Sequence, residues 1–337
     1  MKTVLVTGAA GFIGFYTAKR LLDLGYTVIG IDNINNYYDV TLKYDRLNEL
    51  GIDRSEAEKE NKTVQSVVYP NFQFSRINLE DRVNLPLLFT NYQFDSVVNL
   101  AAQAGVRYSI ENPMAYVDSN IVGFVNLLEC MRQSKVSKLL YASSSSVYGN
   151  SAKVPFSVES QVDHPISLYA ATKKSNELMA HTYSHLFGIQ TVGLRFFTVY
   201  GPWGRPDMAM FLFTDAIIHG KPIKVFNDGN LSRDFTYIDD IVDGLVKILI
   251  SDGDSENYQL FNIGNSAPVR LLDFITEIEN ATGLEAQKIM YPMQPGDVNQ
   301  TWADVENLKN KYGYNATFSI KQGVAAFVAW YKSYYSL

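Results

Sequence analysis

The chain has 337 residues, which is enough for one large or two closely associated domains with a sizeable core. Hydrophobic residues make up 47% and charged residues 19%, as in ordinary soluble globular proteins. The net charge of −6, from 29 basic and 35 acidic side chains, argues against a nucleic-acid-binding protein.

Cys130 is the only cysteine, so an intramolecular disulfide is excluded and a reducing compartment is favoured. It falls in an apolar helical stretch and is interpreted as a small core residue. The N-terminus shows no signal-peptide pattern, and no apolar run reaches membrane-spanning length. We therefore expect a cytoplasmic enzyme with no membrane partner.

The first predicted element is a buried strand, because residues 2–7 (KTVLVT) are apolar and β-branched and a glycine follows. The segment GAAGFIG then opens a helix that should run to Leu24 and stop at Gly25. A second strand, residues 26–31, ends at Asp32. This order of strand, glycine turn, helix, strand and acid is the dinucleotide-binding fingerprint.

Gly8, Gly11 and Gly14 have the spacing G-x-x-G-x-x-G. Their missing side chains would let backbone N–H groups and the helix N-terminus approach a pyrophosphate. Asp32 would accept hydrogen bonds from the adenine ribose and would repel a 2′-phosphate, which favours NAD over NADP. The alternative is a glycine turn in an unrelated α/β protein. The combination of strand, glycine spacing, helix, second strand and Asp32 argues against this alternative.

Residues 33–70 are polar and include a charged stretch at 53–62, which we interpret as one or two exposed inserted helices with a solvated face. Strands and helices then alternate, as in a parallel sheet covered on both faces. The expected strands are 72–77, 95–100, 137–142 and 189–195, and the expected helices are 81–90, 114–133 and 167–187. The glycine turn, AAQAGVR, the serine run and FFTVYGP each follow a strand, so we expect them to converge on one crevice.

After Pro202 the alternation weakens. This part should contain strands at 223–226 and 259–263 and helices near 239–250, 270–281 and 318–335. We predict an α/β fold with a Rossmann-type doubly wound parallel sheet in residues 1–202. Residues 203–337 are expected to form a smaller nucleotide-sugar-binding lobe, with some chain crossing back to the first domain.

A proton-handling set is predicted between residues 141 and 173, where YASSSSVYG is followed by YAATK. Tyr169 and Lys173 are one helical turn apart and share a face. A free tyrosine, with a pKa of about 10, is a poor base, but a nearby ammonium and a positively charged cofactor ring would lower that pKa. The spacing alone is weak in a chain with 22 tyrosines, and the serine run and the dinucleotide fingerprint give it weight.

Several long motifs resemble the extended short-chain dehydrogenase/reductases, and within them the nucleotide-sugar epimerases: GAAGFIG, Asp32, NLAAQAGVR, SSSSVYG, YAATK, RFFTVYGPWGRPDM and SRDFTYIDD. The resemblance is closest to the UDP-glucuronate 4-epimerases and covers nearly the whole chain. It implies NAD as cofactor, a UDP-sugar substrate and a homodimer that pairs the helices near 114–133 and 167–187. The implied chemistry is reversible oxidation at C4 of the sugar, with rotation of a 4-keto intermediate before the hydride returns.

By the same resemblance, Tyr169 is the base, Lys173 lowers its pKa and bonds the nicotinamide ribose, and Ser144 is the helper hydroxyl. Ser143 is interpreted as a capping or turn residue, or as a backbone contact to the cofactor. Asn78 replaces the family's usual Asp near the adenine. The other cofactor-binding candidates are Gly8, Gly11, Phe12, Ile13, Gly14, Asp32, Asn33, Leu79, Leu100, Ala101, Ala102 and Asn120.

Two positions before VYG bear on the reaction. Related 4,6-dehydratases carry Asp-Glu there and related decarboxylases carry a Glu, whereas this chain has Ser145 and Ser146. Hydroxyl donors suit a C6 carboxylate, which favours epimerisation of UDP-glucuronate to UDP-galacturonate. Thr301, small where some relatives carry a bulky residue, leaves UDP-N-acetylhexosaminuronate open, and UDP-hexose is a further alternative. A silent NAD-binding regulator is disfavoured because Tyr, Lys and Ser are all retained.

The other substrate-binding candidates have polar or aromatic side chains. An arginine suits a diphosphate or carboxylate because its guanidinium forms bidentate bonds, although a surface ion pair is the commoner role. Thr198 stands where UDP-galactose 4-epimerases carry an Asn that bonds the diphosphate. Phe226 and Gln294 are expected near the uridine. The three arginines are Arg107, Arg205 and Arg233. The four histidines lack metal-ligand spacing, so no metal is implied.

Overall fold

The computed structural model describes residues 2–251, 256–293 and 298–337. The chain forms two compact units, and each is described by itself. The first unit comprises Met1–Gly149, Val162–Arg195 and Leu245–Phe261, and the second comprises Asn150–Gln161, Phe196–Gly244 and Asn262–Leu337. The division into an NAD-binding domain of residues 1–202 and a nucleotide-sugar-binding lobe of residues 203–337 stays a prediction.

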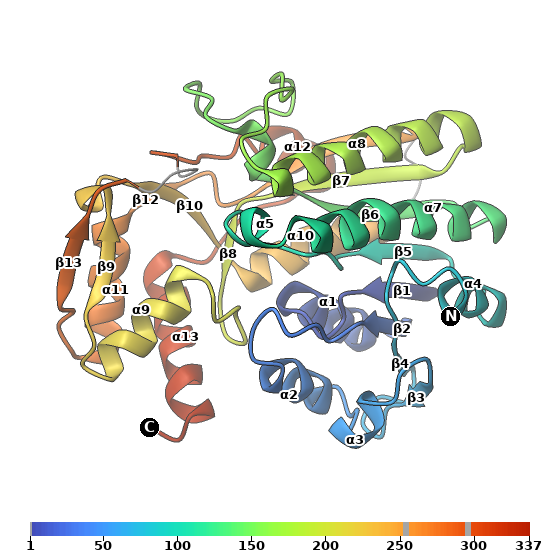
Figure 1. Cartoon of the computed structure of the whole chain (residues 1–337), viewed down its shortest axis with the longest axis horizontal. Coiled ribbons are helices and arrows are strands. Elements are labelled where there is room, and N and C mark those ends of the chain that lie inside the picture. Colours follow the sequence, from blue (N-terminus) through green and yellow to red (C-terminus); the bar gives the residue numbers. More distant parts are fainter. Residues whose placement is uncertain (1, 252–255, 294–297) are drawn as a thin grey trace. The chain divides into compact units, whose positions relative to one another are not determined.

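An eight-stranded sheet in the order β11-β7-β6-β5-β1-β2-β4-β3 organises the first unit (Figure 1). Its strands are β1 (Thr3–Thr7), β2 (Thr27–Asp32), β3 (Thr63–Gln65), β4 (Phe72–Arg76), β5 (Ser96–Asn99), β6 (Lys138–Ser144), β7 (Gln190–Phe196) and β11 (Tyr258–Ile263). β1 pairs in parallel with β2 and β5, and β4 and β6 extend the parallel order on either side. Val4, Leu5 and Val6 of β1 are completely buried, as an apolar β-branched run in a covered sheet requires.

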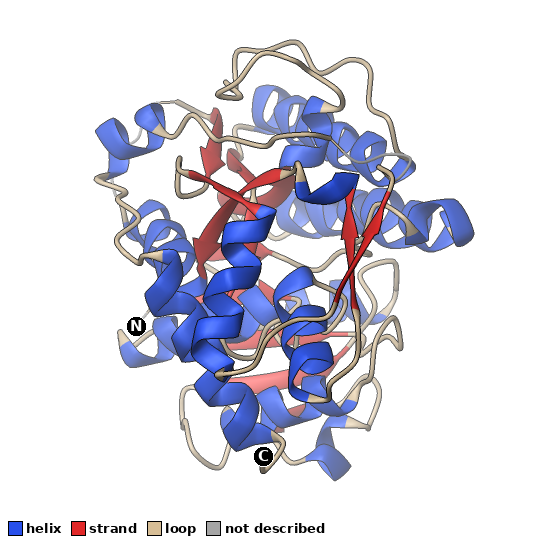
Figure 2. Ribbon diagram, turned by 90° about the vertical axis from the view of Figure 1, so that its left-hand side faces the viewer, coloured by secondary structure: helices blue, strands red, loops and turns tan. Residues whose placement is uncertain are grey.

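Helices accompany these strands, as the alternating pattern predicts (Figure 2). They are α1 (Phe12–Asp23), α2 (Thr41–Glu49), α3 (Arg54–Ala57), α4 (Asn84–Asn91), α5 (Tyr108–Glu111), α6 (Pro113–Tyr116), α7 (Gly123–Gln133) and α8 (Leu168–Phe187). The Ser167 hydroxyl caps α8 by accepting a hydrogen bond from the Ala170 N–H at 3.1 Å. A π-helical turn, η1 (Val117–Val122), separates α6 from α7. Turns of this type are frequent at functional sites.

The inserted segment differs from its prediction in one respect. Its charged stretch around α3 is exposed as expected, but Lys43 and Arg46 of α2 are only 5% and 0% exposed. Both cations are buried because carbonyl oxygens satisfy them: Lys43 Nζ donates to Asn35 O at 2.9 Å, and Arg46 Nη1 donates to Ala10 O at 3.0 Å. The interpretation of all these charges as a solvated face is therefore wrong for α2.

The second unit contains two small sheets, in the orders β12-β10-β8 and β13-β9. The strands are β8 (Thr198–Tyr200), β9 (Ile223–Phe226), β10 (Ser232–Tyr237), β12 (Pro268–Arg270) and β13 (Lys288–Tyr291). The helices are α9 (Ala209–Ile218), α11 (Leu271–Thr282), α12 (Glu306–Tyr312) and α13 (Ile320–Tyr334), with α10 (Ile238–Ile250) spanning the boundary at Leu245. The buried Asp234 carboxylate organises this unit by accepting hydrogen bonds from the N–H groups of Asn265, Ser266 and Ala303.

Cys130 belongs to the apolar core of the first unit, as predicted, beside Leu127 and Met131 of α7. Burial raises the pKa of its thiol to about 11, so it is not a reactive thiolate. Among the helices of the described ranges, none combines the length and the apolar character needed to span a membrane.

Candidate functional site

The glycine turn between β1 and α1 has no space for a side chain at Gly8 or Gly14. A Cβ on Gly14 would lie 2.0 Å from the carbonyl oxygen of Gly8, and Gly8 itself has a φ of 74°. Gly11 is the N-cap of the 12-residue helix α1 and provides no side-chain hydrogen bond to its first turn. The N–H groups of that turn are therefore not occupied by a side-chain cap, which is the arrangement that binds a pyrophosphate.

Asp32 ends β2 beside this turn and is 8% exposed. Its Oδ2 accepts a hydrogen bond from the Ala10 N–H at 3.2 Å, and its Oδ1 accepts one from the Ile34 N–H at 2.8 Å. These two bonds orient the carboxylate, and each oxygen retains acceptor capacity for a ribose hydroxyl. Asn33 follows, and its side-chain oxygen accepts a hydrogen bond from the Asn35 N–H at 3.1 Å.

The loop after β5 carries further cofactor-binding candidates and lies against the glycine turn. A Cβ on Gly8 would come within 2.8 Å of the backbone nitrogen of Ala101. The same nitrogen donates a hydrogen bond to Thr7 Oγ1 at 3.1 Å, and that hydroxyl donates to Asn99 Oδ1 at 2.7 Å. The structure thus brings together the ends of β1 and β5. Leu100 and Ala102 flank Ala101, and Phe12 and Ile13 begin α1, whereas Asn78 and Leu79 follow β4.

Asn120 lies in the π-helical turn and is 2% exposed. Its Oδ1 accepts a hydrogen bond from the Gln103 N–H at 2.9 Å, and its Nδ2 donates to Gln103 O and to Thr172 Oγ1, both at 3.0 Å. Its amide therefore ties the loop after β5 to α8. A direct contact from Asn120 to the cofactor stays a prediction.

The structure brings Tyr169 and Lys173 together on one face of α8. Lys173 is 3% exposed, its Nζ donates to Ala142 O at 2.9 Å, and it lies 6.0 Å from the centre of the Tyr169 ring. Burial lowers the pKa of the Lys173 ammonium to about 8. The half-buried Tyr169 ring packs edge-on against Tyr116, 6.0 Å between ring centres. The Lys173 ammonium thus lies beside the Tyr169 ring, as the spacing of the two residues predicts.

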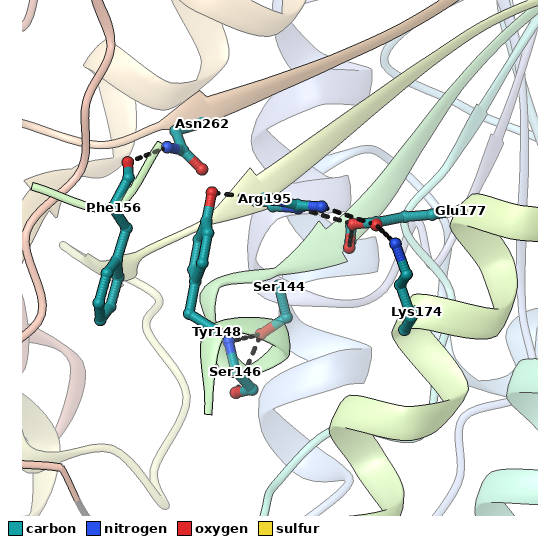
Figure 3. A network of polar contacts seen from close by, with 9 residues as sticks. Ser144, Ser146, Tyr148, Phe156, Lys174, Glu177, Arg195 and Asn262 are labelled. Atoms are coloured by element: carbon teal, nitrogen blue, oxygen red, sulfur yellow. Dashed lines mark hydrogen bonds and ion pairs between the residues drawn. The ribbon is translucent and has the colours of Figure 1, made fainter. Parts of the chain in front are cut away.

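Within the serine run, the side chain of Ser143 bonds to α8, whereas that of Ser144 bonds within the turn that follows. Ser143 is 2% exposed and donates through Oγ to Glu177 Oε1 at 2.7 Å, so its hydroxyl hydrogen is already used within the chain. Ser144 Oγ accepts a hydrogen bond from the Ser146 N–H and donates to Ser146 Oγ, both at 3.1 Å (Figure 3). This bonding opens the 3₁₀ turn η2 (Ser145–Tyr148).

In the second unit, one pocket contains two of the substrate-binding candidates. Thr198 and Arg205 line it together with Tyr200, Met208 and Phe211. The Arg205 guanidinium forms a bidentate pair with Asp207, Nε to Oδ1 at 3.0 Å and Nη2 to Oδ2 at 2.6 Å. The ion-pair alternative is thus present, and a diphosphate contact of Arg205 stays a prediction.

The other substrate-binding candidates among the described residues are not part of that pocket's lining. Arg233 of β10 donates to Ser232 O at 3.0 Å, and Phe226 at the end of β9 packs on Tyr291, 5.6 Å between ring centres. Arg107 is exposed and precedes α5 in the first unit. Gln294 lies outside the described residues. Within the described ranges, no three His, Cys, Asp or Glu side chains are placed to hold a metal ion.

Comparison with known proteins identifies the family. The NAD dependent epimerase/dehydratase family matches residues 4–264. The chain belongs to this family. Protein CapI of Staphylococcus aureus is 51% identical over 98% of this chain and 99% of that protein. A probable UDP-glucuronate 4-epimerase of Rhizobium meliloti is 44% identical, covering 98% and 97%.

The fold agrees with solved structures of the family. A crystal structure of UDP-glucuronic acid 4-epimerase from Bacillus cereus, in complex with UDP-glucuronic acid and NAD, is 35% identical. It covers 99% of this chain and 100% of that chain, with a TM-score of 0.87. These findings confirm the predicted resemblance and the predicted Rossmann-type fold of this NAD dependent epimerase/dehydratase family member. The turn at Gly8–Gly14, which leaves the first turn of α1 uncapped, fits the NAD that the family uses.

Sequence reasoning missed a buried ion pair in the first unit of this epimerase-family chain, between Glu177 of α8 and Arg195 of β7. Arg195 of β7 binds the Glu177 carboxylate through two bonds, Nε to Oε1 at 2.8 Å and Nη2 to Oε2 at 2.9 Å, and both side chains are 1% exposed. Burial opposes the Arg195 charge, but hydrogen bonding to Glu177 raises its pKa above the ordinary value. A signal was present, because Glu177 follows Lys173 at the same spacing at which Lys173 follows Tyr169, placing all three on one face.

Proposed function

We propose that this chain is an NAD-dependent UDP-glucuronate 4-epimerase, which interconverts UDP-glucuronate and UDP-galacturonate. The observation that carries the proposal is the buried Lys173 ammonium beside Tyr169. A lysine supplies a positive charge, and a tyrosine beside it can accept and return a proton. Two relatives bearing the name of this activity, which match 98% and 99% of this chain, support the choice of sugar. The sugar alternatives keep the same chemistry and differ at C2 or C6.

The proton transfer is assigned to residues of the first unit. Tyr169 accepts the proton of the sugar 4-hydroxyl, and Lys173 stabilises the phenolate that makes this transfer favourable. The Ser144 hydroxyl bonds the same sugar oxygen. NAD, when bound by the glycine turn, Asp32 and the loop after β5, supplies the hydride chemistry at C4. After the 4-keto sugar has turned its other face, Tyr169 returns the proton to the oxygen.

The choice of a uronic acid rests on the turn before VYG. Ser145 and Ser146 offer hydroxyl donors, and no acidic side chain occurs between Ser143 and Tyr148. A carboxylate at C6 is stabilised by such donors and would be repelled by an acid in the same place. The absence of an acid in this turn also supports epimerisation over elimination of water or loss of CO2.

The remaining roles are proposals as well. We propose that side chains of the second unit bind the UDP moiety: Thr198, Arg205, Phe226, Arg233 and Gln294. Arg107 of the first unit is assigned to the sugar or the diphosphate. We further propose that the protein is a homodimer that acts in the cytoplasm, where nucleotide sugars are made. Its product would then feed a cell-surface polysaccharide.

A panel of UDP-sugars tests the function. Purified protein would be incubated with NAD and with UDP-glucuronate, UDP-N-acetylglucosaminuronate, UDP-glucose or UDP-N-acetylglucosamine, and the products resolved by NMR. We expect UDP-glucuronate to give UDP-galacturonate without UDP-pentose. Turnover of neutral sugars alone would contradict the carboxylate assignment of Ser145 and Ser146. Accumulation of UDP-pentose would contradict the argument from the missing acid.

A further inference from the structure

We propose that Glu177 and Arg195 are a positioning pair that holds two parts of the site through two separate arms. One arm fixes the proton-transfer groups, and the other fixes the turn assigned to the substrate carboxylate. The inference rests on the proposed epimerase function, and the experiment below separates the two.

The first arm joins α8 to the end of β6. Glu177 Oε1 accepts the hydrogen bond from Ser143 Oγ at 2.7 Å, and Lys173 Nζ donates to Ala142 O at 2.9 Å. Two residues one helical turn apart thus hold two consecutive residues of the strand. The helix can neither slide along the strand nor rotate against it without breaking a buried bond. Because Ser144 is the next residue of β6, the first arm sets its place relative to Tyr169.

The second arm joins β7 to the serine turn. Arg195 Nη1 donates to the Tyr148 hydroxyl at 3.0 Å, and the guanidinium lies 4.9 Å from the centre of the Tyr148 ring (Figure 3). Tyr148 closes the turn η2, which carries Ser145 and Ser146. The placement of these two hydroxyls therefore depends on a residue that lies in a neighbouring strand.

Both carboxylate oxygens of Glu177 have hydrogen-bond partners, which fixes the orientation of this side chain. Oε1 of Glu177 receives bonds from Ser143 and Arg195, and Oε2 receives one from Arg195 with the Lys174 ammonium at 3.5 Å. A buried ion pair is seldom more stable than apolar side chains of the same size. Its bonds to Ser143 and Tyr148 therefore indicate a role in positioning rather than in stability alone.

Single hydroxyl deletions test each arm while the ion pair stays intact. Ser143→Ala removes the bond to Glu177 from the first arm, and Tyr148→Phe removes the hydrogen bond of the second arm while keeping the ring. Matched controls delete the same group elsewhere in the first unit. Ser175→Ala removes a bond from Oγ to Ala171 O, and Tyr183→Phe removes a bond from a tyrosine hydroxyl to Glu129 Oε1.

The two arms should fail in different ways. Ser143→Ala should lower kcat about tenfold or more with KM nearly unchanged, and should move the acidic limb of the kcat profile to higher pH because the Tyr169 phenolate is less stabilised. Tyr148→Phe should weaken binding of UDP-glucuronate about tenfold, and that of UDP-glucose much less, when the NAD-loaded protein is titrated in a calorimeter. Both controls should match wild type.

Equal losses of kcat in both variants that track their Tm, or values like those of the controls, would overturn the proposal. A wild-type protein that turned over no UDP-sugar would instead contradict the proposed function. In that case the calorimetric comparison of Tyr148→Phe with Tyr183→Phe would still decide the second arm, because it needs binding and no turnover. Affinity for UDP-glucuronate equal in these two variants would overturn that arm.

Discussion

Burial of Lys173 connects the packing of the first unit with its chemistry. The side chain is 3% exposed, and burial lowers the pKa of its ammonium from 10.5 to about 8. Since the pKa is lower in the folded chain, the unfolded chain binds this proton more tightly. The buried charge therefore destabilises the fold by about 3 kcal/mol below pH 8, and this penalty disappears as the pH rises to 10.5.

Replacing Lys173 by methionine should remove this pH dependence. We expect the free energy of unfolding of wild type to rise relative to Lys173→Met between pH 8 and 10.5, measured by urea denaturation of NAD-free protein. Lys309→Met, at a side chain 53% exposed, is the control for loss of a lysine. A difference between wild type and Lys173→Met that stays constant over this range would contradict the burial argument.

Tyr169 is the residue on which turnover should depend most. Tyr169→Phe deletes the proton acceptor and keeps the ring that packs on Tyr116. We expect kcat to fall about 10²- to 10⁴-fold, as for loss of a general base, while affinities for NAD and UDP-glucuronate stay within about twofold. Initial rates and calorimetric titrations measure both quantities. Unchanged turnover would show that another group removes the proton.

The turn between β1 and α1 should tolerate no added carbon. Gly14→Ala would place a Cβ 2.0 Å from Gly8 O, so we expect the turn to shift and NAD affinity to fall at least about tenfold. Gly25→Ala is the control at the other end of α1. Its φ is 82° but its Cβ would meet nothing within 4 Å, so it should cost about 1 kcal/mol of stability and leave NAD binding unchanged. Equal NAD affinities would contradict the role of the turn.

Most elements of the first unit could be predicted because their patterns are local. The predicted strand over residues 2–7 and helix over 167–187 appear as β1 and α8, since apolar runs and caps define them within one segment. β8 and β10 could not be predicted, because short strands gain stability only from partners far along the chain. The π-helical turn within the expected helix 114–133 could not be predicted for the same reason. Asn120 in this turn bonds Gln103 and Thr172, which lie far from it in the sequence.

In the candidate site, too, local features could be predicted from the sequence and long-range contacts could not. Tyr169 and Lys173 share a helix, so their spacing alone predicts that they meet. The partners of Ser143 and Ser144 depend on which residues α8 and η2 bring to the strand end, and Arg195 enters from another strand. Arg46 of the inserted segment is buried for a comparable reason, since its acceptor Ala10 belongs to the glycine turn. Long-range hydrogen bonds are therefore what sequence patterns alone do not predict.

The proposed assembly can be tested on exposed apolar side chains of α8. Leu178 and Leu186 are 58% and 61% exposed and lie about two helical turns apart on one face. If two copies pair through this face, the double variant Leu178→Glu/Leu186→Glu should be a monomer where wild type is a dimer. Size exclusion with light scattering measures the mass, and the Tm of the variant should change little. Leu87→Glu, at a leucine of α4 that is 52% exposed, is the control for introducing a charge away from this face. Equal masses for wild type and the leucine variant would contradict pairing through this face.

Tracing the C4 hydrogen of the sugar tests the proposed epimerisation most directly. UDP-glucuronate carrying deuterium at C4 would be incubated with the NAD-loaded protein in ordinary water and followed by NMR. Because Tyr169 removes only the hydroxyl proton, the C4 hydrogen should leave and return as a hydride without exchange, and UDP-galacturonate should retain its deuterium. Product with hydrogen from water at C4, or no UDP-galacturonate at all, would contradict a 4-epimerase of this mechanism.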